Sequence, residues 1–279
     1  MGGVRLDEIG YWSEIKLDIV RKYAQAYATV LANDHRIRGY IYIDAFAGAG
    51  MHISKRTGEF VPGSPLNALN VAPPFSEYHF IDLDGDKAEH LRQLAGDAPN
   101  THFYNEDCNS VLLNKVFARA RWSDYRRALC LLDPYALNLD WEVLRTAGQM
   151  RSVEVFLNFM VMDMNMNVLW RNPDNVLPSQ LERMDAFWGD RSWRGALYQK
   201  PRGLLPGFDW EEKVSNEEVA TAYQKRLKEV AGFAYVPDPM PMRNTRGAVV
   251  YYLFFASPNA TGAKIVSDIF NKYRDRGAS

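Results

Sequence analysis

Four aspartates in this sequence each follow a short hydrophobic stretch, near the place where a buried strand would end: Asp44, Asp82, Asp107 and Asp133. A carboxylate accepts hydrogen bonds from amines and hydroxyls and attracts cations. In open sheets of parallel strands, ligands bind outside the carboxyl ends of the strands. If the four stretches form such a sheet, their carboxylates face one ligand site.

The first aspartate opens the segment Asp44-Ala-Phe-Ala-Gly48-Ala-Gly50. Glycines at the end of a strand let the backbone turn tightly and approach a ligand closely. The Asp44 carboxylate would repel a pyrophosphate, whereas it suits a ligand that carries a sulfonium or an amino group. An ordinary glycine turn is the alternative interpretation.

The second aspartate lies in Phe80-Ile-Asp82-Leu-Asp84. A carboxylate at this place can accept both ribose hydroxyls of a nucleoside. Asp82 and Asp84 both qualify, and we favour Asp82 because it lies nearer the strand. The alternative is that one or both aspartates cap the helix expected from residue 86 onward.

The third aspartate, Asp107, lies in a polar segment after a short strand expected at residues 101–104. Its carboxylate can accept a hydrogen bond from an adenine amino group. Asp107 or Asn109 can equally serve as a helix N-cap. Cys108 would then line the cofactor pocket as a small apolar contact, and nothing around it makes it a nucleophile.

The fourth aspartate belongs to Leu132-Asp133-Pro134-Tyr135. Pro134 pushes Asp133 toward extended geometry and has no backbone N–H of its own. A carboxylate and a carbonyl can thus converge on one amino group, while Tyr135 offers a ring on which a base can stack. This arrangement suits the alkylation of an exocyclic amine, whose lone pair is delocalised into its ring. A strand-ending Asp-Pro turn is the alternative.

A more diffuse signal comes from Arg171, Arg191 and Arg194, which stand among several tryptophans and tyrosines. Basic and aromatic residues together suit base stacking with phosphate contact, so we predict substrate binding here. A solvated helical surface is an equally good interpretation. The five histidines and two cysteines are scattered, and the sequence predicts no metal site.

The elements that must position these residues alternate along the chain. Extended signals at residues 40–46, 78–81, 101–104, 128–132 and 153–157 are each paired with a helical pattern, which predicts a parallel, doubly wound sheet. Residues 160–231 are mainly helical. Residues 233–236 and 249–255 are joined by a loop too short for a crossover helix, so this pair is antiparallel. A helix over 260–273 closes the chain.

These elements predict an α/β fold with a seven-stranded, mostly parallel sheet and a C-terminal antiparallel hairpin. This is the Rossmann-like plan of class I S-adenosylmethionine-dependent methyltransferases. A dinucleotide-binding dehydrogenase has six parallel strands and lacks the hairpin. We expect one methyltransferase-like domain over residues 1–279, in which residues 160–231 form a helical insertion that serves as a lid or wall for the substrate.

The composition is that of an ordinary globular protein. The chain has 279 residues, 33 Lys and Arg against 34 Asp and Glu, and 47% hydrophobic residues. This balance excludes a disordered chain and argues against a protein that coats nucleic acid through bulk charge. The longest apolar run, residues 248–256, is too short to span a membrane, and no signal peptide is evident. The sequence therefore predicts a cytoplasmic protein without a membrane partner.

Taken together, the chain resembles the three-Cys-motif partner protein family, a group of bacterial and phage-associated class I methyltransferase-like proteins. The resemblance covers nearly the whole chain. Its matching stretches are residues 16–23, 42–50, 63–69, 78–82, 107–109, 132–135, 158–159, 187–189 with Trp193, and 251–257. Family members usually have Phe-Gly after the Asp-Pro, whereas this chain has Tyr135-Ala136, and their second acidic residue is often Glu where this chain has Asp82.

The resemblance implies S-adenosylmethionine as cofactor, with S-adenosylhomocysteine as product, and a partner that carries a three-cysteine motif, a radical-type iron–sulfur protein. The Asp-Pro-aromatic motif also resembles that of guanine amino-methyltransferases of transfer RNA. We therefore expect a methyltransferase acting on an amino group of a nucleobase or nucleic acid. A non-catalytic module that binds the cofactor and supports the partner protein is the alternative. A nicotinamide-dependent enzyme is disfavoured by Asp44, by the long gap to Asp82 and by the hairpin.

The expected site is divided into three parts. The catalytic residues are Asp133, Pro134 and Tyr135, and the substrate-binding residues are Arg171, Arg191 and Arg194. The cofactor-binding residues are Asp44, Phe46, Gly48, Gly50, Asp82, Leu83, Asp107 and Cys108.

Overall fold

A seven-stranded sheet forms the centre of the computed structural model, which describes residues 5–200 and 211–274. In spatial order its strands are β11 (Met240–Arg243), β12 (Val249–Ala256), β8 (Val153–Phe159), β7 (Arg126–Leu132), β2 (Gly39–Asp44), β5 (Glu77–Ile81) and β6 (Thr101–Tyr104). The pairs from β8 to β6 are parallel, whereas β12 is antiparallel to both of its neighbours. The predicted fold class is confirmed.

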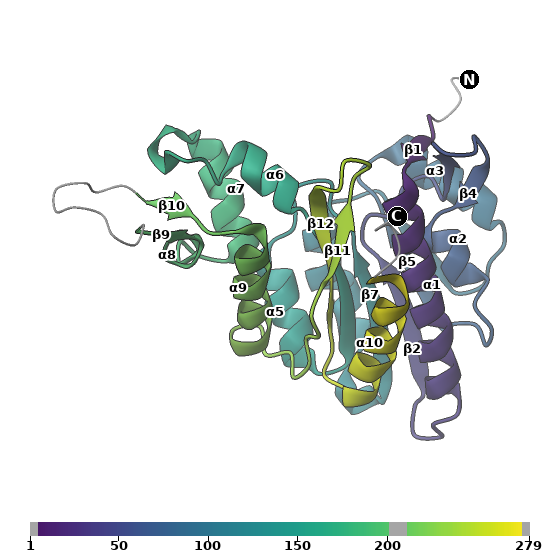
Figure 1. The fold of residues 1–279 in the computed structure, drawn as a ribbon. Helices are drawn as coiled ribbons and strands as arrows, with labels where there is room; N and C mark the ends of the chain where they lie inside the picture. The colour runs from purple at the N-terminus through teal and green to yellow at the C-terminus, as the bar shows by residue number, and fades with distance from the viewer. Residues whose placement is uncertain (1–4, 201–210, 275–279) are drawn as a thin grey trace.

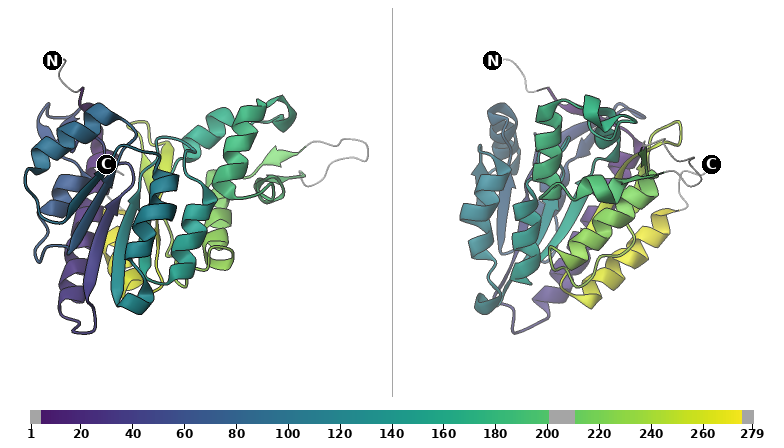
Figure 2. Two further views of the ribbon diagram at one scale, coloured as in Figure 1. Left: turned by 180° about the vertical axis from the view of Figure 1, so that it is seen from behind. Right: turned by 90° about the vertical axis from the view of Figure 1, so that its left-hand side faces the viewer.

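Helices cover both faces of this sheet (Figures 1 and 2). One face carries α1 (Tyr11–Ala32), α2 (Ser64–Leu69), α3 (Gly85–Ala95) and α10 (Ala260–Arg274). The other carries α4 (Cys108–Val111), the turns η1 (Leu112–Val116) and η2 (Phe117–Arg119), and α5 (Trp141–Met150). In β2, Ile41 and Ile43 pack toward the α5 side and Tyr42 toward the α1 side. A strand buried on both faces is hydrophobic at successive positions, which explains the unbroken apolar stretches in the sequence.

The segment between β8 and β11 is mainly helical and extends outward from the β12 side of the sheet (Figure 1). It contains α6 (Val161–Asn167), η4 (Pro173–Asn175), α7 (Pro178–Trp188), α8 (Trp193–Leu197), β9 (Tyr198–Gln199), β10 (Glu212–Lys213) and α9 (Asn216–Glu229). Helices α7 and α9 agree with the helical patterns in the sequence. Ser215 caps α9 in a capping box with Glu218.

The first strand of the C-terminal hairpin was predicted wrongly at residues 233–236. Only an isolated bridge between Tyr235 and Ser257 forms there, and the paired strand β11 starts at Met240. Pro237 and Pro239 lie between the two positions, and a proline has no N–H to donate to a strand ladder. The ladder therefore starts after the second proline.

Residues 51–62 form part of a second sheet. In it β1 (Asp7–Ile9) runs parallel to β3 (Met51–Ser54), and β4 (Phe60–Pro62) runs antiparallel to β3. This pairing brings the N-terminal segment to the edge of the central sheet where β2 ends (Figure 1). None of the helices in the described parts of the chain is long and apolar enough to cross a membrane.

Candidate functional site

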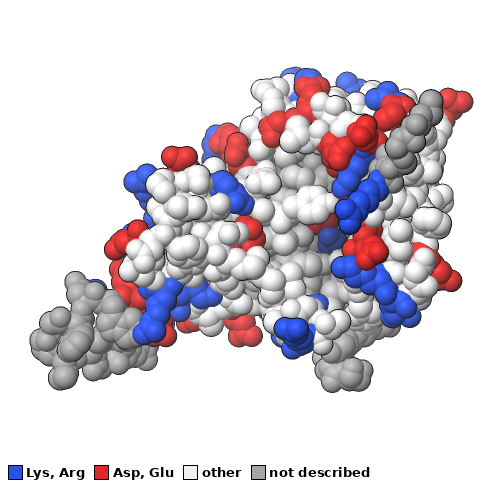
Figure 3. Space-filling view, turned by 90° about the horizontal axis from the view of Figure 1, so that it is seen from above, with Lys and Arg blue, Asp and Glu red and all other residues white. Residues whose placement is uncertain are grey.

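A pocket of about 440 Å³ lies at the carboxyl ends of the central strands. Its walls come from the loop after β2, the ends of β7 and β8, the first turns of α1, and strands β1 and β12. Seen from this edge, charged side chains of both signs surround a hollow (Figure 3). The pocket brings together five residues predicted for the site: Phe46, Gly48, Asp133, Pro134 and Tyr135.

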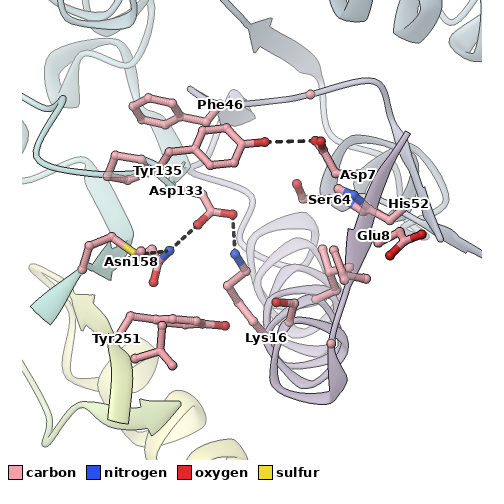
Figure 4. Close-up of a pocket in the computed structure, with 18 of the residues that line it drawn as sticks. Asp7, Glu8, Lys16, Phe46, His52, Ser64, Asp133, Tyr135, Asn158 and Tyr251 are labelled. Atoms are coloured by element: carbon pink, nitrogen blue, oxygen red, sulfur yellow. Dashed lines mark hydrogen bonds and ion pairs between the residues drawn. The ribbon is translucent and has the colours of Figure 1, made fainter. Parts of the chain in front are cut away.

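The Asp133 carboxylate stands at the centre of the pocket and is held on both sides (Figure 4). The Asn158 amide donates a hydrogen bond of 2.7 Å to its Oδ1 atom, and the Lys16 ammonium forms an ion pair with its Oδ2 atom. Tyr135 and Phe46 lie on one side of the carboxylate, and Tyr251 lies on the other. Asp133, which was predicted to be catalytic, therefore has two side-chain partners, Asn158 and Lys16.

Lys16 is a site residue whose role the sequence analysis missed. It precedes Ile19, Val20 and Tyr23 by three, four and seven residues, and all four side chains lie on the buried face of α1. Only 8% of Lys16 is exposed, and its Nζ atom lies 5.5 Å from the centre of the Tyr251 ring. Burial by itself lowers the pKa of Lys16, but the Asp133 carboxylate reverses this and holds the pKa above its ordinary value. The side chain is a cation at neutral pH.

Asp44 lies beneath the pocket and is completely buried at the end of β2. Its Oδ1 atom accepts a long hydrogen bond of 3.4 Å from the Phe46 N–H, and its Oδ2 atom has no hydrogen-bond partner among the described residues. Burial raises the pKa of Asp44 to about 7, and the nearby Asp133 charge acts in the same direction. A cation bound next to Asp44 would therefore favour its ionised form.

The loop after β2 has the tight geometry that its glycines permit. Gly48 and Gly50 have φ values of 62° and 81°, which side chains rarely tolerate. A Cβ atom at Gly50 would also lie 2.7 Å from Leu91 Cδ1. The Gly48 N–H donates a hydrogen bond of 2.7 Å to Asp82 Oδ2, so the loop is held against the end of β5.

The two aspartates after β5 have different roles. Asp84 is the N-cap of α3 and accepts hydrogen bonds from the Asp86 and Lys87 N–H groups. Asp82 does not cap the helix and stays beside the glycine loop, where it also accepts the Asp84 N–H at 2.9 Å. Its neighbour Leu83 is 76% exposed.

Asp107 is the N-cap of α4 and accepts the Ser110 N–H at 2.9 Å, as the alternative interpretation expected. Cys108 is buried, and burial raises the pKa of its thiol to about 12, so it is unreactive. Neither residue lines the pocket around Asp133, and neither do Gly50, Asp82 and Leu83. These five residues follow the strands β2, β5 and β6.

The Tyr135 hydroxyl is held by the N-terminal strand. It donates a hydrogen bond of 3.0 Å to Asp7, which also forms an ion pair of 2.7 Å with Lys87 at the start of α3. Tyr135 as a whole is still 70% exposed. Its ring is thus fixed at the mouth of the pocket while remaining accessible to a planar ligand.

The three arginines predicted to bind substrate do not line the Asp133 pocket. Arg191 forms an ion pair of 3.0 Å with Asp185, and Arg194 forms one of 3.2 Å with Asp174. Arg171 and Arg194 line a separate open cavity of about 770 Å³ on the helical extension. Within the described part of residues 160–231, Met160 alone lines the Asp133 pocket, so most of the extension stands away from it.

One group of side chains has the composition of a metal site. Ligand atoms of Glu77, His79 and His102 lie within 4.8 Å of one another near the amino ends of β5 and β6. Two arginines, Arg119 and Arg126, already neutralise the Glu77 carboxylate, and burial lowers the pKa of His79 to about 4. Two adjacent guanidinium groups oppose a bound cation, so we interpret this group as a structural ion-pair network.

Known proteins resemble this chain in fold. No family model and no curated protein sequence matches it. A Legionella pneumophila protein of the family DUF519 aligns with a TM-score of 0.53 over 96% of this chain and 94% of its own, at 11% identity. A Leishmania major S-adenosylmethionine-dependent methyltransferase aligns with a TM-score of 0.40 over 86% and 72%, at 10% identity, and the carbon methyltransferase DszA with 0.39 over 83% and 50%, at 13%. At 11% identity, the similarity to the Legionella pneumophila protein shows a shared fold alone. The TM-scores of the two methyltransferases are too low to support any inference about this chain.

Proposed function

We propose that this chain is an S-adenosylmethionine-dependent methyltransferase that acts on an amino group of a nucleobase. The observation that carries the proposal is the Asp133 carboxylate, which Asn158 and Lys16 hold beside the glycine loop of β2. That loop lies where a sheet of this topology binds a nucleoside ligand. The chain thus has a polar group suited to an amine next to a place suited to the cofactor.

In this proposal, side chains at different strand ends contact different parts of the cofactor. Asp44 and the glycines hold the amino-acid end, Asp82 the ribose and Asp107 the adenine. Each Asp82 oxygen accepts one backbone N–H, which leaves lone pairs for ribose hydroxyls. An adenine ring beside Leu83 would cover its exposed side chain.

When bound, S-adenosylmethionine supplies a methyl group on a positively charged sulfur to a nucleophile in line with it. The protein's part is to position and stabilise the acceptor. Lys16 and Asn158 each use one lone pair of an Asp133 oxygen, so an acceptor N–H can bind a remaining lone pair while both partners keep the carboxylate in place. Asp133 then fixes the hydrogens of the amine, and its charge stabilises the positive charge that develops on nitrogen. The proton leaves the nitrogen to water afterwards.

Lys16 also restricts the class of acceptor. Its ammonium is buried in the pocket and repels a second cation. An alkylamine is an ammonium ion at neutral pH, whereas an exocyclic amine on an aromatic ring is uncharged. The pocket therefore favours a ring amine, which the accessible Tyr135 ring can stack against.

Removing the Asp82 carboxylate tests the cofactor site directly. Asp82→Ala deletes the acceptor for the ribose hydroxyls and frees the Gly48 N–H, so we expect affinity for S-adenosylhomocysteine to fall about fivefold or more, since a lost hydrogen bond costs on the order of 1 kcal/mol. Calorimetric titration measures this affinity, and NAD is the control ligand that should not bind. Asp84→Asn retains the α3 cap and is the matched control. Unchanged affinity in Asp82→Ala would remove Asp82 from the site.

The affinity for S-adenosylmethionine should depend on pH through Asp44. A bound sulfonium or ammonium group favours the ionised carboxylate, so binding releases a proton and strengthens as the pH rises through 7. Between pH 6 and 7.5 the ionised fraction of a group with a pKa of about 7 rises ~8-fold, and the affinity should rise by a similar factor. Titrations across this range measure the slope.

Asp44→Asn is the control for that experiment, because the ligand's own amino group also titrates. This variant keeps the shape of the side chain and should bind with a flatter pH dependence. Burial lowers the pKa of His52, the histidine that lines the pocket, so His52 does not explain a slope centred at 7. Equal slopes in the wild type and Asp44→Asn would exclude Asp44 as the titrating group.

A second function has a specific observation in its favour. Both Asp133 oxygens are engaged by the protein itself, as expected for a module that binds the cofactor without transferring its methyl group. Such a module would support a partner carrying a three-cysteine motif, and the proposal of that partner rests on the sequence resemblance. Transfer of labelled methyl groups to a nucleic-acid mixture, with and without the partner, distinguishes the two functions.

A further inference from the structure

A second large cavity lies at the opposite end of the sheet. It measures about 780 Å³ and is bounded by the end of α1, the turn η3 (Trp122–Asp124), the amino ends of β7 and β8, and the start of α10. We call it the basal cavity. The pocket around Asp133 lies at the carboxyl ends of the same strands, so the two sites share no lining residue. The volume is in the range of small-molecule binding sites.

Buried polar residues lie at the floor of the basal cavity. Ser152 and Tyr27 line it and are 1% and 7% exposed, and their hydroxyls have no hydrogen-bond partner among the described residues. The Glu154 carboxyl also lines the floor, where it accepts hydrogen bonds from Tyr23 and Ser257. Buried hydroxyls are nearly always paired, so two without a partner beside one cavity are unusual.

The mouth of the cavity carries cations without carboxylate partners. The Arg127 guanidinium lies 3.6 Å from the centre of the Trp122 ring, donates to the Arg126 carbonyl and forms no ion pair with any described residue. Partial burial lowers its pKa, which shows that this cation is partly desolvated. Arg151 likewise has no ion pair within the described chain, whereas the neighbouring Arg36 is satisfied by Asp34.

Aromatic surface surrounds these cations. Trp122 and Tyr235 line the cavity and are 55% and 42% exposed, which is high for such large side chains. An exposed ring next to an unpaired guanidinium suits a ligand that is both planar and anionic, because the ring stacks while the anion pairs with the cation.

We propose that the basal cavity binds a small molecule that joins an oxyanion to a planar ring, with the chemistry of a nucleoside monophosphate. The oxyanion pairs with Arg127 and Arg151, and the ring covers Trp122 or Tyr235. The Glu154 carboxyl faces the same space, and because burial raises its pKa to about 7, a large part of it is neutral at that pH and opposes an anion little.

Calorimetric titration of the full chain with adenosine 5′-monophosphate tests this proposal, with inorganic phosphate and adenosine as partial ligands. The nucleotide should bind at least tenfold more tightly than either part. Arg127→Gln should weaken nucleotide binding tenfold or more. Arg121→Gln, an exposed arginine of the same segment that does not line the cavity, should leave it unchanged. Thermal melting confirms that each variant is folded.

Adenosine 5′-monophosphate could also bind at the proposed cofactor site. The Asp82→Ala variant distinguishes binding there from binding in the basal cavity. Binding that persists in Asp82→Ala and is lost in Arg127→Gln supports the basal cavity, whatever the fate of the methyltransferase proposal. Binding that is lost in Asp82→Ala and persists in Arg127→Gln overturns it. Absence of binding by the wild type at millimolar nucleotide overturns it as well.

Discussion

Replacing Asp133 with asparagine should lower methyl transfer by about two orders of magnitude or more, the usual loss when one electrostatic partner of a transition state is removed. The variant keeps the shape of the side chain but loses the charge that pairs with Lys16 and would stabilise the developing cation on the acceptor. The cofactor is held by other strand ends, so the affinity for S-adenosylhomocysteine, which is neutral at sulfur, should change only about twofold. Single-turnover transfer of labelled methyl groups and calorimetry measure the two quantities separately.

The control for this experiment lies at the same edge of the sheet. Asp84→Asn removes a carboxylate that caps α3, and asparagine caps helices equally well, so the rate should not change. Methyl transfer at the wild-type rate in Asp133→Asn would refute the catalytic role of Asp133. If the wild type with its three-Cys-motif partner transfers no label, the binding module replaces the enzyme as the better account.

The acidic strand ends could be predicted from sequence because their signals are local. Each aspartate follows its own hydrophobic strand, and the parallel order of those strands brings Asp44, Asp82 and Asp133 to one edge. The alternation of strand and helix patterns is also a local signal, and it predicted a parallel sheet with helices on both faces. Patterns of a few residues suffice for such features.

The partners of Asp133 could not be predicted in the same way, because they are far from Asp133 in the sequence. Lys16 lies 117 residues from Asp133, and a lysine in an amphipathic helix ordinarily faces solvent. The signal was present in its spacing from Ile19 and Tyr23, which places it on the buried face of α1. The strand β1 and its Asp7–Tyr135 contact gave no comparable signal, since three residues are too few to show a period.

Composition carries no direction, so the sequence could not show how the three predicted arginines lie relative to Asp133. Arg191 and Arg194 do lie near aromatic residues, but α7 and α8 turn Trp188 and Trp193 into the core while the arginines pair with aspartates at the surface. Nucleic-acid contact by Arg171, Arg191 and Arg194 therefore stays a prediction for a surface outside the Asp133 pocket.

Replacing Lys16 with methionine should strengthen binding of S-adenosylmethionine relative to S-adenosylhomocysteine by about 30-fold. The two ligands differ at sulfur, which is positive in the first and neutral in the second, and the proposed site puts that sulfur near the Lys16 ammonium. If the proposed site puts the two charges about 8 Å apart, they repel each other by about 2 kcal/mol at an effective dielectric constant near 20, which corresponds to this factor. Methionine fills similar space without the charge, and calorimetry of both ligands gives the ratio.

Lys22→Met is the matched control, because Lys22 lies on the same helix and pairs with Asp18 outside the pocket. It should leave the ratio unchanged, whereas Lys16→Arg should preserve it because the charge remains. A ratio that is unaltered in Lys16→Met would mean that sulfur binds far from Lys16 and hence far from Asp133. The Asp133 carboxylate could then not orient an acceptor amine toward the methyl group, even if Asp82 and Asp44 bind the cofactor as proposed.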